Sequence, residues 1–334
     1  MKIFKFLLAG VFFSIHLASV AQQLQKRTVT LMGSRWDITI VARDALTAEN
    51  YIDTIIAEVT RIEYLISDWK PETQVSALNR NAGIAPVKVD KEVLDLTRRA
   101  IHISDITGGA FDISFAAMEK IWKFDGSMTE MPPEAMVKKA VEKVGYKNII
   151  IDTVNSTIFL KEKGMKIGFG ALGEGYAADR CRSMMMAKGI EAGIVNGSGD
   201  ISTWGRQPGG KPWSAGISDP FHRGDIYAVV PLLYKTSVAT SGNYEKYAEI
   251  NGKRYSHIIN PKTGYPATGL VSVTVFGPAT EMCNAFSTSL MVMGKDAGLA
   301  LLSSYEDYSC IIVSDKGKLY TSPGFRLKKY RVKH

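Results

Sequence analysis

The stretch Asn148–Gly175, NIIIDTVNSTIFLKEKGMKIGFGALGEG, separates the fold classes open to this sequence. It begins with two short apolar runs, 148–152 and 157–161, whose intervening turn residues predict a β-hairpin. A third apolar run, 165–169, predicts a strand that leads through a glycine-rich turn into a helix at about 175–188. A hairpin immediately before this unit breaks the strict strand–helix alternation of a parallel sheet.

The rest of the chain follows the same mixed pattern of helical and strand periodicity. Helices are predicted at 47–67, 91–107 and 282–293, and strands on either side of Met32-Gly33-Ser34 (27–42) and at 193–196, 226–230, 271–276 and 310–313. Helices interspersed with hairpin strands favour an α+β fold with largely antiparallel sheet and packed helices.

Composition and net charge limit the kinds of ligand that this protein is expected to bind. The 334 residues are 46% hydrophobic and carry a net charge of +8, which suits a globular protein with a sizeable core and a polyanionic small-molecule ligand. A nucleic-acid-binding face would need a basic stripe with interleaved aromatic residues, and the sequence has none. Part of the charge is terminal: Lys328, Lys329, Arg331 and Lys333. The three widely spaced cysteines, Cys181, Cys283 and Cys310, favour buried apolar residues over a disulfide framework.

The N-terminus has the pattern of a secretory signal peptide. Lys2 and Lys5 precede the apolar run Phe6–Val20, and small residues lead to a cleavage point after Ala21. A membrane anchor is the alternative, but the run is short and interrupted by His16. No cysteine lies near the cleavage point, so the sequence predicts export to the periplasm without lipid attachment. The mature chain, 22–334, is expected to form one domain.

Gly168, Gly170 and Gly173 match the spacing of the dinucleotide fingerprint G-x-G-x-x-G. Such a turn lets backbone N–H groups and a helix N-terminus approach a phosphate. A dinucleotide fold also requires an acidic residue at the end of the next strand, where this chain has Asn196-Gly197. A tight strand–helix turn with no ligand remains the alternative.

Two further segments combine turn residues with polar side chains. The turn Val195–Asp200 can form an anion-binding nest or an ordinary β-turn. Thr240–Tyr244 and the segment from His257 to Pro266 gather hydroxyl groups and a histidine. His257 is a candidate general base or phosphate donor, and a purely structural histidine is the alternative.

Asn284 and Thr288 lie four residues apart in a predicted helix and therefore share one face. Their oxygens can point at one hard cation such as Mg²⁺, which takes oxygen ligands. Helix capping by Asn284 is the alternative.

In order and spacing, these segments resemble the bacterial FAD:protein FMN transferase family, often called ApbE, over roughly Thr28 to Gly294. The resemblance is carried by Met32-Gly33-Ser34, Ser67-Asp68-Trp69, Ser76–Asn79, Gly109–Asp112 with Trp122, Gly170–Asp179, Asn196–Asp200, Thr240–Gly242 and the His257 to Pro266 segment.

The resemblance implies a T-fold-related architecture and one transferase domain over 22–334. It also implies an activity: FAD binds with Mg²⁺, a threonine or serine hydroxyl of a partner protein attacks the FMN phosphorus, and AMP leaves. His257 is the expected base. The expected FAD contacts are Met32, Trp69, Asp112, Gly170, Glu174, Gly197, Ser198, Gly199, Asp200, Thr240, Ser241, Gly242, His257 and Thr263, and the expected metal ligands are Gly173, Glu174, Asn284 and Thr288.

The chain departs from the family pattern at three positions. Glu174 stands for the usual lysine of the glycine turn, Gly168 for a frequent aspartate, and Asn284 for a metal-binding aspartate. We hypothesise that Glu174 replaces the carboxylate lost at 284. The alternatives are a FAD-binding protein or FAD pyrophosphatase with a weakened metal site, and, in another class, an oxidoreductase that uses Gly168–Gly173.

Overall fold

The computed structural model describes residues 22–118, 121–222, 224–233, 236–243, 246–325 and 327. The predicted signal peptide, Tyr244 and the four terminal cations lie outside these residues. Among the residues that are described, no helix is long and apolar enough to cross a membrane.

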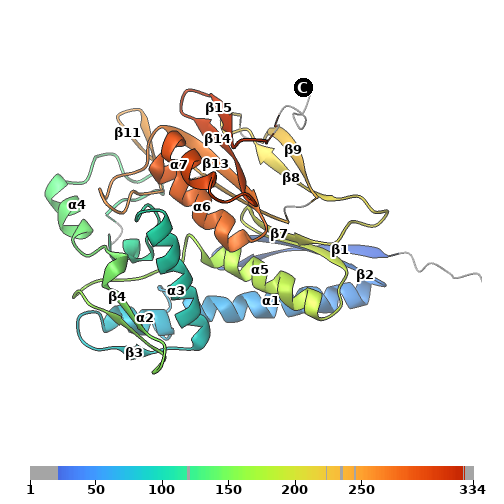
Figure 1. The fold of residues 1–334 in the computed structure, drawn as a ribbon, viewed down its shortest axis with the longest axis horizontal. Helices are drawn as coiled ribbons and strands as arrows, with labels where there is room; N and C mark the ends of the chain where they lie inside the picture. The colour runs from blue at the N-terminus through green and yellow to red at the C-terminus, as the bar shows by residue number, and fades with distance from the viewer. Residues whose placement is uncertain are drawn as a thin grey trace, which may run out of the picture.

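The centre of the molecule is an eight-stranded sheet in the order β1-β2-β6-β7-β10-β13-β14-β15, with every pairing antiparallel (Figure 1). Its strands are β1 (Gln23–Leu31), β2 (Ser34–Ala42), β6 (Ala192–Gly197), β7 (Asp200–Trp204), β10 (Ser237–Gly242), β13 (Leu270–Gly277), β14 (Ser309–Ser314) and β15 (Leu319–Thr321).

Three smaller antiparallel sheets surround it. They are formed by β3 (Val87–Lys88), β5 (Thr157–Leu160) and β4 (Ile149–Asp152); by β8 (Trp213–Ser218) and β9 (Ile226–Leu232); and by β11 (Tyr247–Ile250) and β12 (Lys253–Ser256). The helices are α1 (Ala45–Ile66), α2 (Gln74–Arg80), α3 (Lys91–Ile106), α4 (Glu134–Val141), α5 (Gly173–Ala187), α6 (Thr280–Met293) and α7 (Lys295–Leu302), with 3₁₀ turns η1 (Ile113–Met118) and η2 (Tyr146–Asn148).

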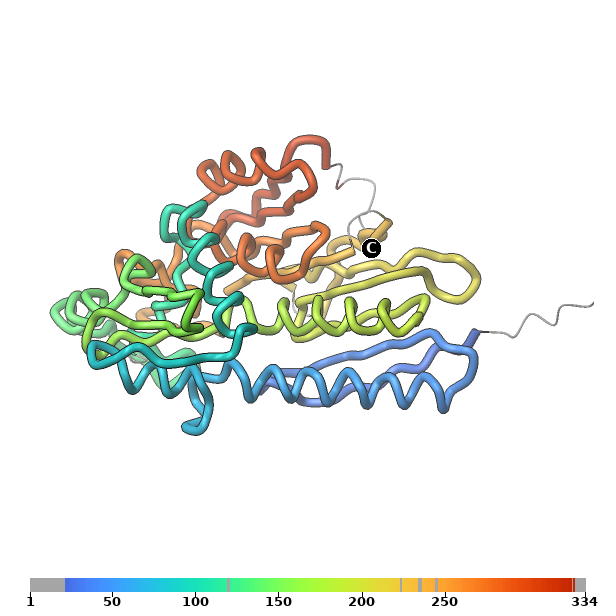
Figure 2. Tube along the Cα trace, turned by 60° about the horizontal axis from the view of Figure 1, so that its bottom comes forward, coloured from blue at the N-terminus to red at the C-terminus, as the bar shows by residue number. Residues whose placement is uncertain are grey.

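Helices cover one face of the central sheet. The alternate residues Trp36, Ile38 and Ile40 of β2 are fully buried in one core with α1 and α5, which lie side by side (Figure 2). The helices α6 and α7 cover β10, β13 and β14 on the same side through a second core. Each large aliphatic side chain buried in this way stabilises the fold by about 1.5–3 kcal/mol relative to exposure.

The hairpin β8–β9 covers the other face. The intervening residues of the central strands, such as Val41, Val238, Phe276 and Ile311, point to this side and form a third core with β8 and β9. The sheet is therefore buried on both faces, between helices and a two-stranded ribbon.

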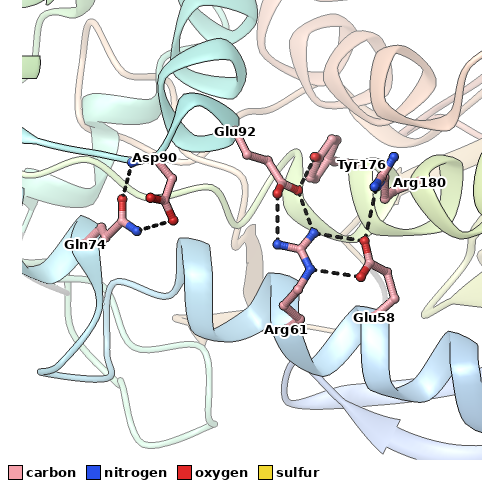
Figure 3. A network of polar contacts seen from close by, with 7 residues as sticks. All are labelled: Glu58, Arg61, Gln74, Asp90, Glu92, Tyr176 and Arg180. Carbon is pink, nitrogen blue, oxygen red and sulfur yellow. Dashed lines mark hydrogen bonds and ion pairs between the residues drawn. The ribbon is translucent and has the colours of Figure 1, made fainter. Parts of the chain in front are cut away.

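A polar network ties α1, α3 and α5 together (Figure 3). Arg61 of α1 donates to Glu58 on its own helix and to Glu92 of α3, each at 2.9 Å. Glu92 also accepts a hydrogen bond from the Tyr176 hydroxyl, and Glu58 accepts one from Arg180, both on α5. The network holds the first turns of α5 against α1 and α3.

Most of the predicted elements are confirmed, including the hairpin at 148–161, the three long helices and the antiparallel sheet. The strand predicted at 165–169 is wrong. The backbone groups of this run bond to partners outside any sheet. The Asn79 side chain exchanges two hydrogen bonds with the Ile167 backbone, and the Gly168 N–H donates to the Ile113 carbonyl. Without a parallel strand before α5, the glycine turn does not form a dinucleotide-binding unit.

Candidate functional site

A cavity of about 960 Å³ lies where the central sheet meets the segments before α5 and after β10. It is within the size range of cofactor sites. Segments far apart in sequence meet in its wall: the β1–β2 turn, η1, the glycine turn at 168–174, the β6–β7 turn, β10, the His257 segment and α6. The glycine-rich and polar stretches singled out in the sequence therefore converge on one place.

Two carboxylates mark one end of the cavity. Glu174, on the first turn of α5, accepts a hydrogen bond of 2.5 Å from Ser34 Oγ. Asp200, at the start of β7, is buried and accepts a hydrogen bond from the Asn284 amide of α6. Burial and the nearby Glu174 charge raise the pKa of Asp200 well above its usual range, and burial also raises the pKa of Glu174. A cation bound near both carboxylates would offset their mutual repulsion.

Hydroxyl groups line the same cavity. Ser241 Oγ of β10 lies 3.1 Å from Thr288 Oγ1 and 2.8 Å from Ser287 Oγ, both on α6. Thr240 Oγ1 lies 2.9 Å from Thr274 Oγ1 of β13. Within the described ranges, no three His, Cys, Asp or Glu side chains form a metal cluster. The oxygen groups of this wall are the two carboxylates and the hydroxyls, while the Asn284 amide nitrogen donates to Asp200.

The backbone of β10 offers further hydrogen-bonding groups to the cavity. The Asn243 N–H donates to Val271, so odd-numbered residues of β10 bond to β13 and even-numbered residues face the opposite edge. On that edge β7 pairs only with Ser237 and Val238. The N–H and C=O groups of Thr240 and Gly242 therefore lie on an open strand edge in the cavity wall.

The β6–β7 turn requires an unusual backbone. Ser198 and Gly199 both have positive φ, 51° and 103°, as a two-residue hairpin of primed type demands. The Asn196 side chain accepts from the Gly199 N–H at 2.9 Å, and the Ser198 N–H is bound by the Arg35 carbonyl. These bonds fix the turn that presents Asp200 to the cavity.

Glycines in the first turn of α5 allow close packing. A Cβ on Gly173 would lie 2.7 Å from Ile66 Cδ1, and one on Gly175 would lie 2.8 Å from the Thr280 carbonyl of α6. A Cβ on Gly168 would lie 2.8 Å from Asp68 Oδ2. The Asp68 carboxylate thus occupies the space beside the position where the family pattern often has an aspartate.

His257 has a defined tautomer. Its Nδ1 lies 3.0 Å from the Lys246 carbonyl, which can only accept, so Nδ1 carries the proton and Nε2 keeps its lone pair. The ring packs edge-on against Phe124, with centroids 6.3 Å apart. Burial lowers the pKa of His257, which keeps the imidazole neutral near pH 7.

Some polar and aromatic residues of the cavity wall were not among the residues selected from the sequence. Lys246 is the only lysine or arginine among the described residues that line the cavity, and it follows β10 without any motif to mark it. Ser34, Asp68 and Phe124 also line the wall. Ser34 and Asp68 belong to segments quoted for the family resemblance, so the motif was a signal for them.

Three predicted contacts are placed differently from the rest. Asp112 lies at the wall, but its oxygens accept bonds from Ser114 and from the Tyr146 N–H. Gly197 is not in the wall and packs against the Trp36 ring, while Thr263 is exposed in the turn beyond Pro261. The remaining predicted residues line the cavity: Met32, Trp69, Gly170, Gly173, Glu174, Ser198, Gly199, Asp200, Thr240, Ser241, Gly242, His257, Asn284 and Thr288.

The comparisons with known proteins agree with this geometry. Residues 32–312 match the ApbE family, and the chain belongs to it. It is 29% identical to the FAD:protein FMN transferase of Salmonella typhimurium over 92% of this chain and 89% of that protein. It is 30% identical to one from Klebsiella pneumoniae over 90% of this chain and 92% of the relative.

The fold is shared with solved structures of the family. The crystal structure of the ApbE protein from Thermotoga maritima superposes with a TM-score of 0.83 at 30% identity, covering 93% of this chain and all of that one (100%). The apo flavinyl transferase ApbE of Pseudomonas stutzeri gives 0.79 at 25% identity, over 91% and 96% of the two chains. These matches confirm the resemblance and the α+β, antiparallel fold expected from the sequence.

Proposed function

We propose that this protein transfers FMN from FAD to a threonine or serine hydroxyl of a target protein and releases AMP. Family membership over most of the chain supports the reaction class. The observation that carries the proposal is the single cavity in which paired carboxylates, glycine turns, an open strand edge and a neutral histidine meet.

His257 suits the role of base. Its Nε2 is free of the Lys246 bond and can take the proton of the acceptor hydroxyl as the new O–P bond forms. The P–O bond to AMP breaks as that bond forms, and the leaving phosphate carries away the electron pair. Lys246 is positioned in the same wall to offset negative charge on the pyrophosphate.

The acidic end of the cavity fits Mg²⁺. Asp200 is buried, Glu174 is half-buried, and their charges interact. The hydroxyls of Ser241 and Thr288 line the same cavity, and carboxylate and hydroxyl oxygens are the donors that a hard cation takes. Glu174 and Asp200 would hold the ion with Thr288, Asn284 and the Gly173 backbone. Bound there, Mg²⁺ would offset charge on phosphate oxygens. The closeness of Glu174 to Asp200 supports the idea that Glu174 replaces the carboxylate missing at 284.

The proposal is tested by incubating the purified chain with FAD, Mg²⁺ and a threonine-containing peptide. We expect AMP and a flavin-labelled peptide in equal amounts, both abolished by EDTA. AMP and free FMN without labelled peptide would identify a FAD hydrolase. Bound FAD with no AMP would identify a binding protein. A nicotinamide-dependent oxidation by this chain would contradict the proposal outright.

We also propose that the chain is exported and cleaved after Ala21, as its N-terminal pattern indicates. The mature protein recovered from a periplasmic extract should begin at Gln22. A chain that keeps Met1 in the cytoplasmic fraction would contradict export.

A further inference from the structure

The strand β8 has one open edge. It pairs with β9 alone in the described structure. Pro231 of β9 lies opposite Ser214, and proline has no N–H, so this pair cannot exchange hydrogen bonds. The bonded pairs therefore fall on the odd-numbered residues of β8. The N–H and C=O groups of Ser214 and Gly216 point away from β9, along the open edge.

This edge runs into the cavity. Four consecutive residues, Ala215 to Ser218, line the cavity wall. Successive side chains of a strand point to opposite faces, so a cavity over one face would touch only alternate residues. Contact with all four places the cavity beside the strand, along its edge.

The edge also lacks the features that usually block strand addition. Charged side chains or proline commonly protect exposed edges. The sequence of β8, WSAGIS, contains neither. The outer edge of β9, in contrast, carries Pro231, whose nitrogen points outward. Within the described residues, the edge of β9 is therefore interrupted by proline, whereas the edge of β8 meets the cavity without such an interruption.

We infer that the target protein presents its threonine or serine in an extended segment that adds to the open edge of β8 as an antiparallel or parallel strand. The inference rests on the proposed transfer to a protein hydroxyl. Main-chain hydrogen bonds to Ser214 and Gly216 would supply affinity, and the strand would lead the acceptor residue into the cavity beyond Ser218. In this mode of recognition, main-chain hydrogen bonds supply affinity and pockets for alternate side chains supply specificity.

Ser214 offers a matched pair of variants. Ser214→Pro removes one outward N–H without touching a β8–β9 hydrogen bond, and Ser214→Ala keeps that N–H. The probe is a positional-scanning library of nine-residue peptides with one central threonine. We expect Ser214→Pro to raise the peptide KM about tenfold while FAD affinity and AMP release without peptide stay at the level of Ser214→Ala.

Equal peptide KM values for the two variants would overturn docking on β8 while leaving the transferase activity intact. If wild type and Ser214→Ala also label no peptide, the proposed function itself fails. Should Ser214→Pro not fold, N-methylated peptides test the inference on the wild-type protein.

A second measurement needs no variant. Peptides from the best-labelled sequence are N-methylated one residue at a time and assayed with the wild-type protein. Strand addition predicts loss of labelling at alternate positions, because only every second N–H faces β8. Uniform sensitivity or uniform tolerance along the peptide would overturn the inference.

Discussion

At the scale of single residues, the role of His257 can be tested directly by substitution. Replacing it by Gln keeps a side chain that can donate to the Lys246 carbonyl but removes the basic nitrogen. We expect His257→Gln to lower kcat for FMN transfer by about 10²–10⁴ with little change in FAD affinity. Stopped-flow or coupled AMP assays measure the first, and flavin fluorescence the second. A variant with wild-type kcat would remove His257 from the chemistry.

The pH profile provides a separate check on the same residue. A base acts unprotonated, so activity falls on the acid side of its pKa. Burial lowers the pKa of His257, so the acid limb of kcat/KM should have its midpoint below about 6.5, the usual histidine value. A midpoint above that value would contradict the buried, neutral imidazole.

The hypothesis that the Glu174 carboxylate replaces the one lost at position 284 can also be tested with single residues. Glu174→Lys should abolish Mg²⁺-dependent AMP release, because it places a cation beside Asp200 where the metal charge is needed. Asn284→Asp should impair this AMP release by adding a third carboxylate beside Glu174 and Asp200. The double variant should recover metal-dependent turnover. Unchanged Mg²⁺ dependence in Glu174→Ala would end the hypothesis.

At the scale of elements, one side chain of α5 hydrogen-bonds to the N-terminus of α6, and these two helices carry residues of the acidic site. Ala279 is the N-cap residue of α6, and its side chain cannot accept a hydrogen bond from the first N–H groups of the helix. Asp179 of α5 accepts from the Glu281 N–H at 2.9 Å instead, and from Ser202 Oγ at 2.9 Å. Asp179 therefore joins α5, which carries Glu174, to α6, which carries Asn284 and Thr288.

Asp179→Ala should lower the free energy of unfolding by about 1–3 kcal/mol, because it leaves a helix N–H and a buried hydroxyl without their acceptor. It should weaken Mg²⁺ binding as well, since a hydrogen bond that joins the two helices is lost. Denaturant titration and metal titration measure these effects, with Asp179→Asn, which keeps one acceptor oxygen, as the milder control. Wild-type stability in Asp179→Ala would show that the cap is dispensable.

Elements with strong local periodicity could be predicted from the sequence. The apolar stripe of α1 and the alternation in β2 specify their buried faces without reference to the rest of the chain. The run 165–169 could not be read correctly, because Asn79, 88 residues away, binds its backbone. The short helix α7 and the strands β8 and β10 also lacked a distinct local pattern.

The candidate site, like the fold, could be predicted only where local sequence patterns specify it. Turns with required glycines and hydroxyl clusters were visible in the sequence, and the structure brings them together in one wall. The place of Lys246 depends on how the chain leaves β10, and the place of Asp68 depends on the space beside Gly168. No local pattern records either contact, since both arise from packing between distant segments.

At the scale of the whole molecule, the acidic site costs stability when no cation is bound. The folded-state pKa of Asp200 is raised above its unfolded value. A carboxyl group of this kind stabilises the fold fully at pH values below its unfolded pKa, and that contribution is lost as pH rises through the folded pKa. At neutral pH the metal-free chain therefore holds a buried carboxyl that either keeps its proton or pays for ionising beside Glu174.

Asp200→Asn isolates this effect on global unfolding. Without metal, the variant should be more stable than wild type at about pH 7.5, by on the order of 1–2 kcal/mol, and the difference should shrink toward pH 5 as the wild-type carboxyl takes up its proton. Saturating Mg²⁺ should reverse the order, because it stabilises only the chain that keeps both carboxylates, in proportion to its occupancy. Urea titrations at several pH values, with and without Mg²⁺, measure both changes. If Asp200→Asn is less stable than wild type in metal-free buffer at neutral pH, Asp200 serves the fold and not a cation, and the electrostatic account of the cavity is wrong.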